Sequence, residues 1–489
     1  MTAKVLMFMG TGSDVGKSLI VAGLCRLLAN RGLRVAPFKP QNMSNNAAAT
    51  TDGGGEIGRA QALQARAAKV PASVHMNPVL LKPESETGAQ IIVQGKRVAT
   101  MKAKDFFAER QQFMPAILDS FRQLAESHDY ILVEGAGSPA EANLRQGDLA
   151  NMGFAQAVKA PVIIIGDIHR GGVIASLIGT HAVLDPSDQN RIKAFLINKF
   201  HGDPNLFVEG ENLIEARTNW PSLGVIPHFP DAHHLPAEDA VALEANLPVT
   251  INGIEICVLK LPRIANFDDL DPLRLEPGVA LRFLNPGEVL PATCDLVVIP
   301  GSKSTMADLA ALRQHGWDID ILAHARRGGK VLGLCGGYQM LGQMIHDPQG
   351  LEGPPGSMPG LGLLDVETTL SGEKTVTPTT ALHVTSCKTI EAYEIHLGQT
   401  IGPDTQKPFA LKQNQPEGAT NPAGNIIGTY LHGCFTSDGF RHAFLKTLGV
   451  DSPSLAYDAL IEETLDKLAR HLEQSIDIEQ MLALAEYPQ

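Results

Sequence analysis

One cysteine in the sequence KVLGLCGGYQML (Lys330–Leu341) stands where a nucleophile could act. A short apolar run ends at Cys335, and Gly336 and Gly337 follow before residues that can begin a helix. Strand, tight turn and helix in this order hold a side chain clear of its own backbone, and the N–H groups after the turn can bind an oxyanion. Taken alone, the stretch is equally compatible with a buried structural cysteine followed by a glycine turn.

A cysteine nucleophile needs a base, because a free thiol with a pKa of about 8.5 is mostly protonated at neutral pH. His432 in GTYLHGCF follows the predicted strand NIIGTY and is the preferred base, and His396 in YEIHLG is its rival. Gly301, in the loop PGSKST after another predicted strand, can supply an N–H to the oxyanion hole beside that of Gly336. Together these residues predict a glutaminase-like site.

A different chemistry is indicated near the start of the chain by GTGSDVGKS (Gly10–Ser18). A predicted strand, Lys4–Met9, precedes this loop, and a predicted helix, Leu19–Asn30, follows it. In that context the backbone N–H groups and the helix N-terminus bind phosphates, Lys17 neutralises their charge and the Ser18 hydroxyl can bind Mg²⁺. The sequence therefore predicts a phosphate-binding loop, with a glycine-rich turn that binds nothing as the alternative.

The spacing of this loop departs from the usual phosphate-loop pattern. Counting back from Gly16, Thr11 takes the place of the first glycine, and Gly10 lies one residue further out. We expect Thr11, Gly12 and Gly16 to line the nucleotide together with the lysine and serine.

Carboxylates near the ends of predicted strands are the candidates for metal and substrate. The polar segment 39–50 leads to Asp52 and Glu56, which predicts either a substrate and metal loop or a solvated connection. Glu134 follows the strand Tyr130–Val133, and ligands of open α/β sheets bind where parallel strands end. Glu134 is therefore placed for Mg²⁺ or substrate.

Further along, Asp148 and Asp167 add carboxylates in or near such loops. Arg170 precedes a glycine pair that opens a helix, which suits an anion, although a surface ion pair is an equal alternative for this residue.

Two α/β patterns divide the chain. We expect a phosphate-loop domain with a parallel sheet over 1–230, an acidic, proline-bounded linker over 231–250, a second α/β domain over 251–445 and a helical segment over 446–489. Predicted strands of the second pattern include Ile254–Leu259, Leu296–Pro300 and His383–Lys388, and Arg263–Leu273 is predicted to be a loop.

Amino-acid composition narrows the range of functions and compartments that fit this chain. The 489 residues carry 40 basic and 53 acidic side chains, a net charge of −13, which argues against a nucleic-acid surface. No stretch of 18 apolar residues and no signal-peptide pattern occurs, and the six cysteines include no CxxC pair. These features predict a protein of the reducing cytoplasm without membrane partners, disulfides or a zinc site.

The second half of the chain resembles a class I glutamine amidotransferase domain, and the first half resembles the dethiobiotin synthetase branch of phosphate-loop proteins, whose loop has the same longer spacing. Two halves joined in this order resemble the cobyrinic and cobyric acid amidotransferase family. The motifs that carry the resemblance are spread over roughly residues 4–445: PFKPQNMSNNA, NPVLLKP, EGAGSPAE, DIHRGGV, PGSKST, GLCGGYQMLG, YEIH and GTYLHG.

The resemblance implies a glutamine-hydrolysing amidoligase of cobalamin biosynthesis. The expected reaction is amidation of four peripheral carboxylates (b, d, e and g) of adenosylcobyrinic acid a,c-diamide, to give adenosylcobyric acid, with ATP, Mg²⁺ and glutamine as ammonia donor. It implies Ser18, Asp52 and Glu134 as metal ligands. Lys39 and Arg170 would act on substrate and phosphoryl groups, and Asp148 would orient substrate or ammonia.

Three alternatives and one departure from the family pattern remain. The first alternative is the sister enzyme that amidates the a and c carboxylates. The second is a partition-type ATPase switch, although that class carries a lysine where this loop has Thr11 and Gly12. The third is a degenerate amidotransferase domain that serves only as a scaffold, against which the presence of both Cys335 and His432 counts. Many class I domains place a glutamate two residues after the histidine to orient its ring, whereas this chain has Cys434 there. The group that orients His432 is thus left open by the sequence.

Overall fold

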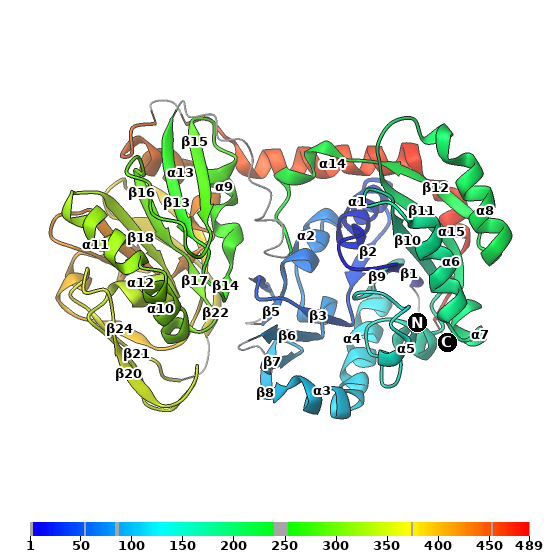
Figure 1. Ribbon diagram of the computed structural model, residues 1–489, viewed down its shortest axis with the longest axis horizontal. Coiled ribbons are helices and arrows are strands. Elements are labelled where there is room, and N and C mark those ends of the chain that lie inside the picture. Colours follow the sequence, from blue (N-terminus) through cyan, green and yellow to red (C-terminus); the bar gives the residue numbers. More distant parts are fainter. Residues whose placement is uncertain are drawn as a thin grey trace. The chain divides into compact units, whose positions relative to one another are not determined.

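The chain folds into two compact units, each with its own core. The computed structural model describes residues 3–52, 55–83, 88–238, 253–372, 375–450 and 453–488. The first unit consists of Met1–Ser44, Thr50–Pro236 and Ile461–Gln489, and the second of Asn45–Ala49 and Ala237–Leu460 (Figure 1). Most of the predicted linker 231–250 lies outside the described residues.

A six-stranded parallel sheet forms the centre of the first unit. Its strands β1 (Lys4–Gly10) and β10 (Val162–Asp167) are almost entirely buried and largely apolar, as expected for the centre of a parallel sheet covered on both faces. Across the sheet the strands are β12 (Ser222–Pro227), β11 (Ile192–Phe200), β10, β1, β9 (Tyr130–Glu134) and β2 (Val35–Phe38). The loop 10–16 therefore leaves a central strand, β1, beside the end of β9.

Helices and a small second sheet complete this unit. The helices are α1 (Lys17–Asn30), α2 (Arg59–Ala67), α3 (Ala103–Glu109), α4 (Met114–Ser127), α5 (Met152–Val158), α6 (Val173–Val183), α7 (Pro186–Gln189) and α8 (Val208–Thr218). The small sheet has the order β3 (Gln41–Met43), β6 (Val79–Pro83), β7 (Gly88–Val93) and β8 (Lys96–Lys102), and β5 is Glu56–Gly58.

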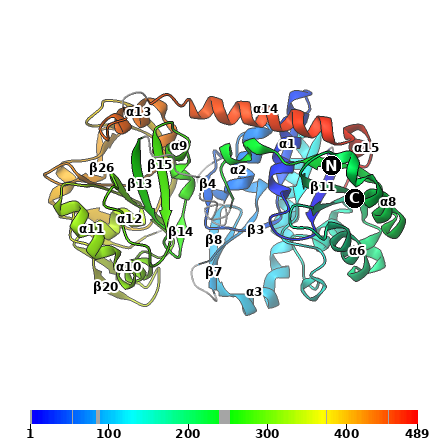
Figure 2. The same ribbon diagram turned by 45° about the horizontal axis from the view of Figure 1, so that its top comes forward.

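The end of the chain returns to the first unit. Helix α14 (Tyr457–Ser475) is one long, unbroken helix (Figure 2), and from Ile461 onward it belongs to this unit, followed by α15 (Ile478–Ala483). Its carboxylate Glu462 binds the guanidinium of Arg26, a fully buried side chain of α1. A Cβ at Gly23 of α1 would collide with Leu472, so the absence of a side chain lets the two helices meet closely.

The second unit is built on another sheet, parallel except at one edge. Its strands are β15 (Val279–Leu284), β13 (Ile254–Leu259), β16 (Leu296–Ile299), β18 (Lys330–Leu334), β28 (Ile426–Thr429) and the antiparallel β27 (Ala419–Thr420). The helices are α9 (Asp271–Arg274), α10 (Thr305–Gln314), α11 (Trp317–Arg326), α12 (Gly336–Leu341) and α13 (Asp438–Lys446). Two parallel sheets with flanking helices confirm the predicted fold class.

Smaller sheets accompany this one, antiparallel except for one parallel pair of strands. One sheet pairs β14 (Ile264–Ala265) with β17 (Gly301–Ser302). A second has the order β20 (Gly356–Pro359), β19 (Met344–Asp347), β21 (Glu367–Thr369) and β24 (Gln399–Ile401), in which β19 and β21 are the parallel pair. A third has the order β26 (Gln415–Glu417), β25 (Ala410–Lys412), β22 (Thr375–His383), β23 (Thr389–His396) and β29 (Leu431–His432). A further strand, β4 (Ala47–Ala49), comes from the first half of the sequence.

Two sequence predictions are wrong in this half of the chain. His383–Lys388 is not a strand: His383 ends β22 and the following residues form the hairpin turn to β23, with Cys387 in the left-handed region. Nor is Arg263–Leu273 a plain loop, because it holds β14, the 3₁₀ helix η7 (Phe267–Leu270) and α9. No helix among the described residues has the length and apolarity to cross a membrane.

Glycines let helix α12 press directly onto the sheet. A Cβ at Gly337 would lie 2.0 Å from the carbonyl oxygen of Ile299 in β16. On β28, a Cβ at Gly428 would lie 1.9 Å from Cδ2 of Tyr338, a fully buried side chain of α12. The position of α12, and of the cysteine that precedes it, is thus fixed by contacts that admit no side chain.

We expect Gly428→Ala to destabilise the second unit, because the new methyl group must displace the Tyr338 ring in a close-packed core. Overpacking of this kind costs about 1–3 kcal/mol. Thermal unfolding should show the loss, and Gly353→Ala is the matched control, since a Cβ there has no neighbour within 4 Å. Equal unfolding temperatures for the two variants would contradict this account of the packing.

Candidate active site

Cys335 occupies a strained turn between β18 and α12. Its backbone has φ 52° and ψ −107°, a combination outside the left-handed helical region that a side-chain-bearing residue tolerates. The turn is held by the bond from the Cys335 amide to the carbonyl of Thr429 at 2.9 Å. The thiol is half-buried, with Sγ 3.4 Å from the carbonyl oxygen of Ile395. Strain of this type, imposed by surrounding structure, is common at reactive residues.

His432, on β29, is hydrogen-bonded to two other side chains. Nδ1 lies 2.6 Å from Oδ2 of Asp269, and the other oxygen of Asp269 accepts the N–H of Gly433 at 2.7 Å. The imidazole also makes a side-chain hydrogen bond with Cys335. Asp269, from helix η7, is therefore the group that orients the histidine.

Charge at this site favours a protonated histidine. Burial alone would lower the pKa of His432, but the charge and hydrogen bond of Asp269, with the bond to Cys335, raise that pKa to about 10. An imidazolium at neutral pH stabilises an adjacent thiolate, which is the reactive form of cysteine. The arrangement Asp269–His432–Cys335 therefore provides a nucleophile and a proton donor for its leaving group.

The rival residues differ from His432 in their surroundings. His396 stacks on Tyr430 with ring centroids 4.0 Å apart, and burial lowers its pKa to about 4. Its Nδ1 has no hydrogen-bond partner among the described residues. Cys434, at the position where many related domains have a glutamate, is buried, and burial raises the pKa of its thiol. These two residues are not arranged to serve Cys335.

Two glycines predicted for the oxyanion hole lie beside the cysteine and histidine. Gly336 is the first residue of α12, and a Cβ there would lie 3.1 Å from the backbone nitrogen of Ser302. A Cβ at Gly301 would lie 3.4 Å from Cε1 of His432. The β17 backbone and the α12 N-terminus thus meet next to the nucleophile, where N–H groups can stabilise negative charge.

Two of the phosphate-loop glycines, Gly10 and Gly16, are required by the shape of the loop, whereas a Cβ at Gly12 would have no neighbour within 4 Å. A Cβ at Gly10 would lie 2.5 Å from Val15 and 3.1 Å from the Lys17 ammonium, which explains a glycine one residue outside the usual pattern. Gly16 has φ 96° and caps α1, and a Cβ there would lie 2.3 Å from Nδ2 of Asn198. The amide of Thr11 donates to Ile165 at 2.9 Å.

Lys17 folds back over this loop. Its ammonium donates to the carbonyls of Gly12 at 2.9 Å and of Gly137 at 3.1 Å. The far side of the loop is held by β11, where Asn198 donates to the carbonyl of Val15 at 2.8 Å. The lysine thus lies in the loop, where it can meet phosphate oxygens.

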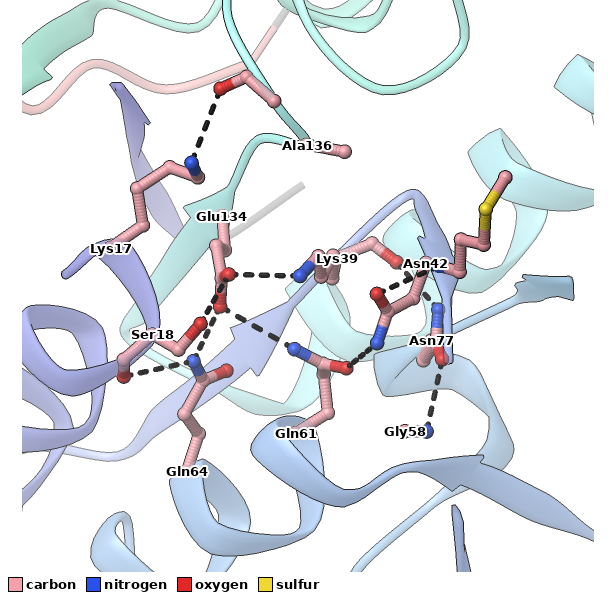
Figure 3. A network of polar contacts seen from close by, with 12 residues as sticks. Lys17, Ser18, Lys39, Asn42, Gly58, Gln61, Gln64, Asn77, Glu134 and Ala136 are labelled. Carbon is pink, nitrogen blue, oxygen red and sulfur yellow. Dashed lines mark hydrogen bonds and ion pairs between the residues drawn. The ribbon is translucent and has the colours of Figure 1, made fainter. Parts of the chain in front are cut away.

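Glu134, at the end of β9, gathers several side chains around one buried carboxylate (Figure 3). Oε1 accepts the Ser18 hydroxyl at 2.7 Å and the Lys39 ammonium at 2.9 Å. Oε2 accepts the amide of Gln64 at 2.6 Å, and Gln61 lies at 3.4 Å. Residues from β9, α1, α2 and the segment after β2 are thus brought together.

Ser18 and Glu134 fit a magnesium ion better than Asp52 does. A hydroxyl and a carboxylate 2.7 Å apart are the oxygen ligands that magnesium uses beside phosphate and water. Asp52 instead accepts the N–H of Val74 at 3.2 Å, in the 3₁₀ helix η1 (Val74–Met76). No cluster of three acidic, histidine or cysteine side chains suited to a metal occurs in the described part of the chain.

The two remaining predicted residues have other surroundings. Asp148 holds the turn that leads into helix α5, because its carboxylate accepts the amides of Ala150, Asn151 and Gly153 at 2.9, 3.0 and 2.9 Å. Arg170 is exposed in the turn before α6. The structure therefore gives Asp148 a structural role that the sequence did not suggest.

Three side chains of these sites were missed by sequence reasoning: Asp269, Gln61 and Gln64. Asp269 lies in the acidic run NFDDLDP, but that run offers three aspartates and no spacing that selects one. The two glutamines are three residues apart on α2, so they share a helix face, a signal visible in the sequence.

We predict that Asp269→Asn slows glutamine hydrolysis by about 10²- to 10⁴-fold, the range typical of general acid–base catalysis. Without the carboxylate charge, burial dominates and the pKa of His432 falls from about 10. Because the imidazolium is lost as pH rises through its pKa, the alkaline limb of the pH–rate profile should move to lower pH.

The neighbouring substitution Asp268→Asn is the matched control and should leave the alkaline limb in place. If Asp269→Asn retains the wild-type profile, the carboxylate does not set the protonation of His432.

Comparison with known proteins agrees with two catalytic units in one chain. Residues 255–440 match the CobB/CobQ-like glutamine amidotransferase domain, and residues 6–241 match the CobQ/CobB/MinD/ParA nucleotide binding domain. These matches confirm the predicted combination of glutaminase and ATP-binding domains.

Full-length relatives are also found. A cobyric acid synthase of Cereibacter sphaeroides is 58% identical over 480 residues, covering 98% of this chain and 99% of the relative. Cobyric acid synthases of Bradyrhizobium diazoefficiens and Rhodobacter capsulatus are 58% and 57% identical, covering 99% and 98% of this chain and 100% and 99% of their own length. The chain therefore belongs to the cobyric acid synthase family.

Proposed function

We propose that this protein amidates four peripheral carboxylates (b, d, e and g) of adenosylcobyrinic acid a,c-diamide, to give adenosylcobyric acid. The observation that carries the proposal is the presence, in one chain, of a cysteine–histidine–aspartate arrangement and a phosphate loop with a buried carboxylate. Relatives named cobyric acid synthase align over nearly the whole chain. Glutamine, ATP and a corrinoid are the expected substrates.

In the glutaminase half, the thiolate of Cys335 attacks the amide carbon of glutamine. The oxyanion forms beside the backbone of Gly301 and Gly336, and the imidazolium of His432 gives its proton to the leaving ammonia. A water molecule, deprotonated by the same histidine, then cleaves the thioester to glutamate and the free thiol. Asp269 keeps the ring oriented in both steps.

In the synthetase half, a corrinoid carboxylate attacks the γ-phosphorus of ATP and ADP leaves. Ammonia then attacks the acyl phosphate and displaces phosphate, which leaves the amide. Lys17 and Lys39 neutralise the phosphoryl charge. Ser18 and Glu134 would hold magnesium, which would add positive charge beside the phosphates, and Arg170 is an exposed candidate for a substrate carboxylate.

The reaction suits the cytoplasm, where ATP and glutamine are abundant. All six cysteines are free, and a catalytic thiol persists in a reducing compartment.

Mass spectrometry of the corrinoid product tests the proposal directly. Incubation with glutamine, ATP and adenosylcobyrinic acid a,c-diamide should replace four carboxyl OH groups by NH₂ in succession. Amidation of cobyrinic acid at only two positions would identify the sister activity, and ATP hydrolysis without corrinoid amidation would favour a nucleotide switch.

Cys335→Ala should abolish glutamine-dependent amidation, because no thioester can form, while amidation with free ammonium stays within about twofold of wild type. The product assay above measures both reactions. Cys387→Ser, at an exposed free cysteine, is the control that should retain both.

Lys17→Ala should lose amidation with either nitrogen source, since its charge serves the phosphoryl step. A failure of ammonium to rescue Cys335→Ala would overturn the division of labour between the two halves.

A further inference from the structure

A short piece of the first half of the sequence is built into the second unit. Asn45–Ala49 is grouped with Ala237–Leu460, although the residues on either side, up to Ser44 and from Thr50, belong to the first unit. Ala47 is fully buried, and Asn46 is buried and donates to the carbonyl of Ala237 at 3.1 Å. This segment, 45–49, therefore has a fixed place in the glutaminase unit.

The side chain of Asn266 contributes to holding segment 45–49 in place. Its amide nitrogen donates to the carbonyl oxygen of Ala47 at 3.3 Å and to the hydroxyl of Tyr393 at 2.9 Å. The residue is buried and has φ 54°, a left-handed conformation that asparagine tolerates better than most side chains. A neutral amide with two N–H donors is what two oxygen acceptors require here.

The backbone at Asn266 is connected in two ways to the residues around Cys335 and His432. The preceding residue, Ala265 of β14, pairs with Gly301 of β17. The carbonyl of Asn266 accepts the amide of Asp269 at 3.1 Å, within the turn that presents the Asp269 carboxylate to His432. A shift of Asn266 would therefore be felt at the oxyanion loop and at the orienting carboxylate.

The second acceptor, Tyr393, leads to the same place. Its ring stacks on the His432 ring, with centroids 5.4 Å apart and planes 18° apart, and the two residues face each other across β23 and β29. Asn266 thus reaches the catalytic histidine by two routes, through Asp269 and through Tyr393.

At its other end, segment 45–49 is continuous with residues that serve the phosphate site. Lys39 pairs with Glu134, and Asn42 donates to Gln61, which also contacts Glu134. Only two residues of chain separate Asn42 from Asn45. The backbone therefore offers a short path from Lys39 and Asn42, at the phosphate site, to Ala47 in the glutaminase unit.

We propose that Asn266 is a positioning residue that makes the alignment of His432 depend on the state of the phosphate site through segment 45–49. Glutamine is then hydrolysed at full rate only when the synthetase substrates are bound, so that ammonia is released when an acyl phosphate can capture it. The inference rests on the proposed function, because it concerns the coupling of the two reactions assigned there.

The test is the stimulation of glutamine hydrolysis by MgATP and adenosylcobyrinic acid a,c-diamide. Couplings between sites are typically about 5- to 150-fold, so we expect at least about fivefold stimulation in the wild type. Asn266→Asp keeps the shape and the left-handed backbone but removes both donors, and its stimulation should fall to about onefold. Ammonium-supported amidation should stay within about twofold of wild type.

Tyr393→Phe removes the hydroxyl and keeps the ring on His432, so it should lose part of the stimulation. The double variant should then be no worse than Asn266→Asp alone. Asn219→Asp is the matched control: Asn219 also has φ 57°, but it ends α8 in the first unit. This control should retain wild-type stimulation.

A reciprocal measurement separates coupling from simple loss of structure. A coupling free energy acts in both directions, so glutamine bound to Cys335→Ala should tighten ATP binding, and the added Asn266→Asp substitution should abolish that effect. Stimulation that persists in Asn266→Asp would overturn the proposal, and so would a wild-type enzyme that shows no stimulation. A wild-type enzyme that amidates no corrinoid with either nitrogen source would instead overturn the proposed function.

Discussion

The buried pair of His432 and Asp269 is the interaction on which the glutaminase unit depends. Both side chains are almost fully removed from solvent, 3% and 2% exposed, and their atoms lie 2.6 Å apart. Loss of one partner from such a pair typically costs about 3–5 kcal/mol, because the other charge is left without compensation. The pair fixes the histidine ring and, through the Gly433 amide, the backbone of β29 against helix η7. The same buried pair therefore stabilises the fold of this unit and orients its histidine.

In the phosphate-binding unit, a different buried carboxylate, that of Glu134, organises the site. Glu134 is buried at the end of β9, and the loop serine, Lys39 and two glutamines of α2 satisfy its oxygens. A carboxylate held in this way cannot turn away from the loop, so its oxygens are already placed when nucleotide arrives. In each unit, a single acidic side chain brings together groups from distant parts of the sequence. Because these groups are already ordered, less conformational entropy is lost when a ligand binds.

Local sequence patterns predicted the strands, turns and helices whose conformation depends on residues nearby in the chain. They did not predict features that depend on contacts between distant segments. The strand–turn–helix around Cys335 and the loop before α1 follow from apolar runs and glycines, and both were predicted with their helices and strands. The hairpin turn after His383 resembles a strand in sequence, since Val384 and Thr385 favour extended structure. Asp269 could not be selected from its acidic run, since its role is set by a histidine 163 residues away. The saturation of the Asp148 carboxylate by three backbone amides likewise depends on a local fold that composition does not show.

Helix α14 has a consequence for how this chain can be divided. The nucleotide-binding unit is finished by residues from Ile461 onward, which supply Glu462 to the buried Arg26 and Leu472 to the glycine face of α1. A fragment that ends near residue 238 would leave that guanidinium without its carboxylate and expose the apolar side of α1. During synthesis, the first unit therefore cannot be completed until the ribosome has made the glutaminase.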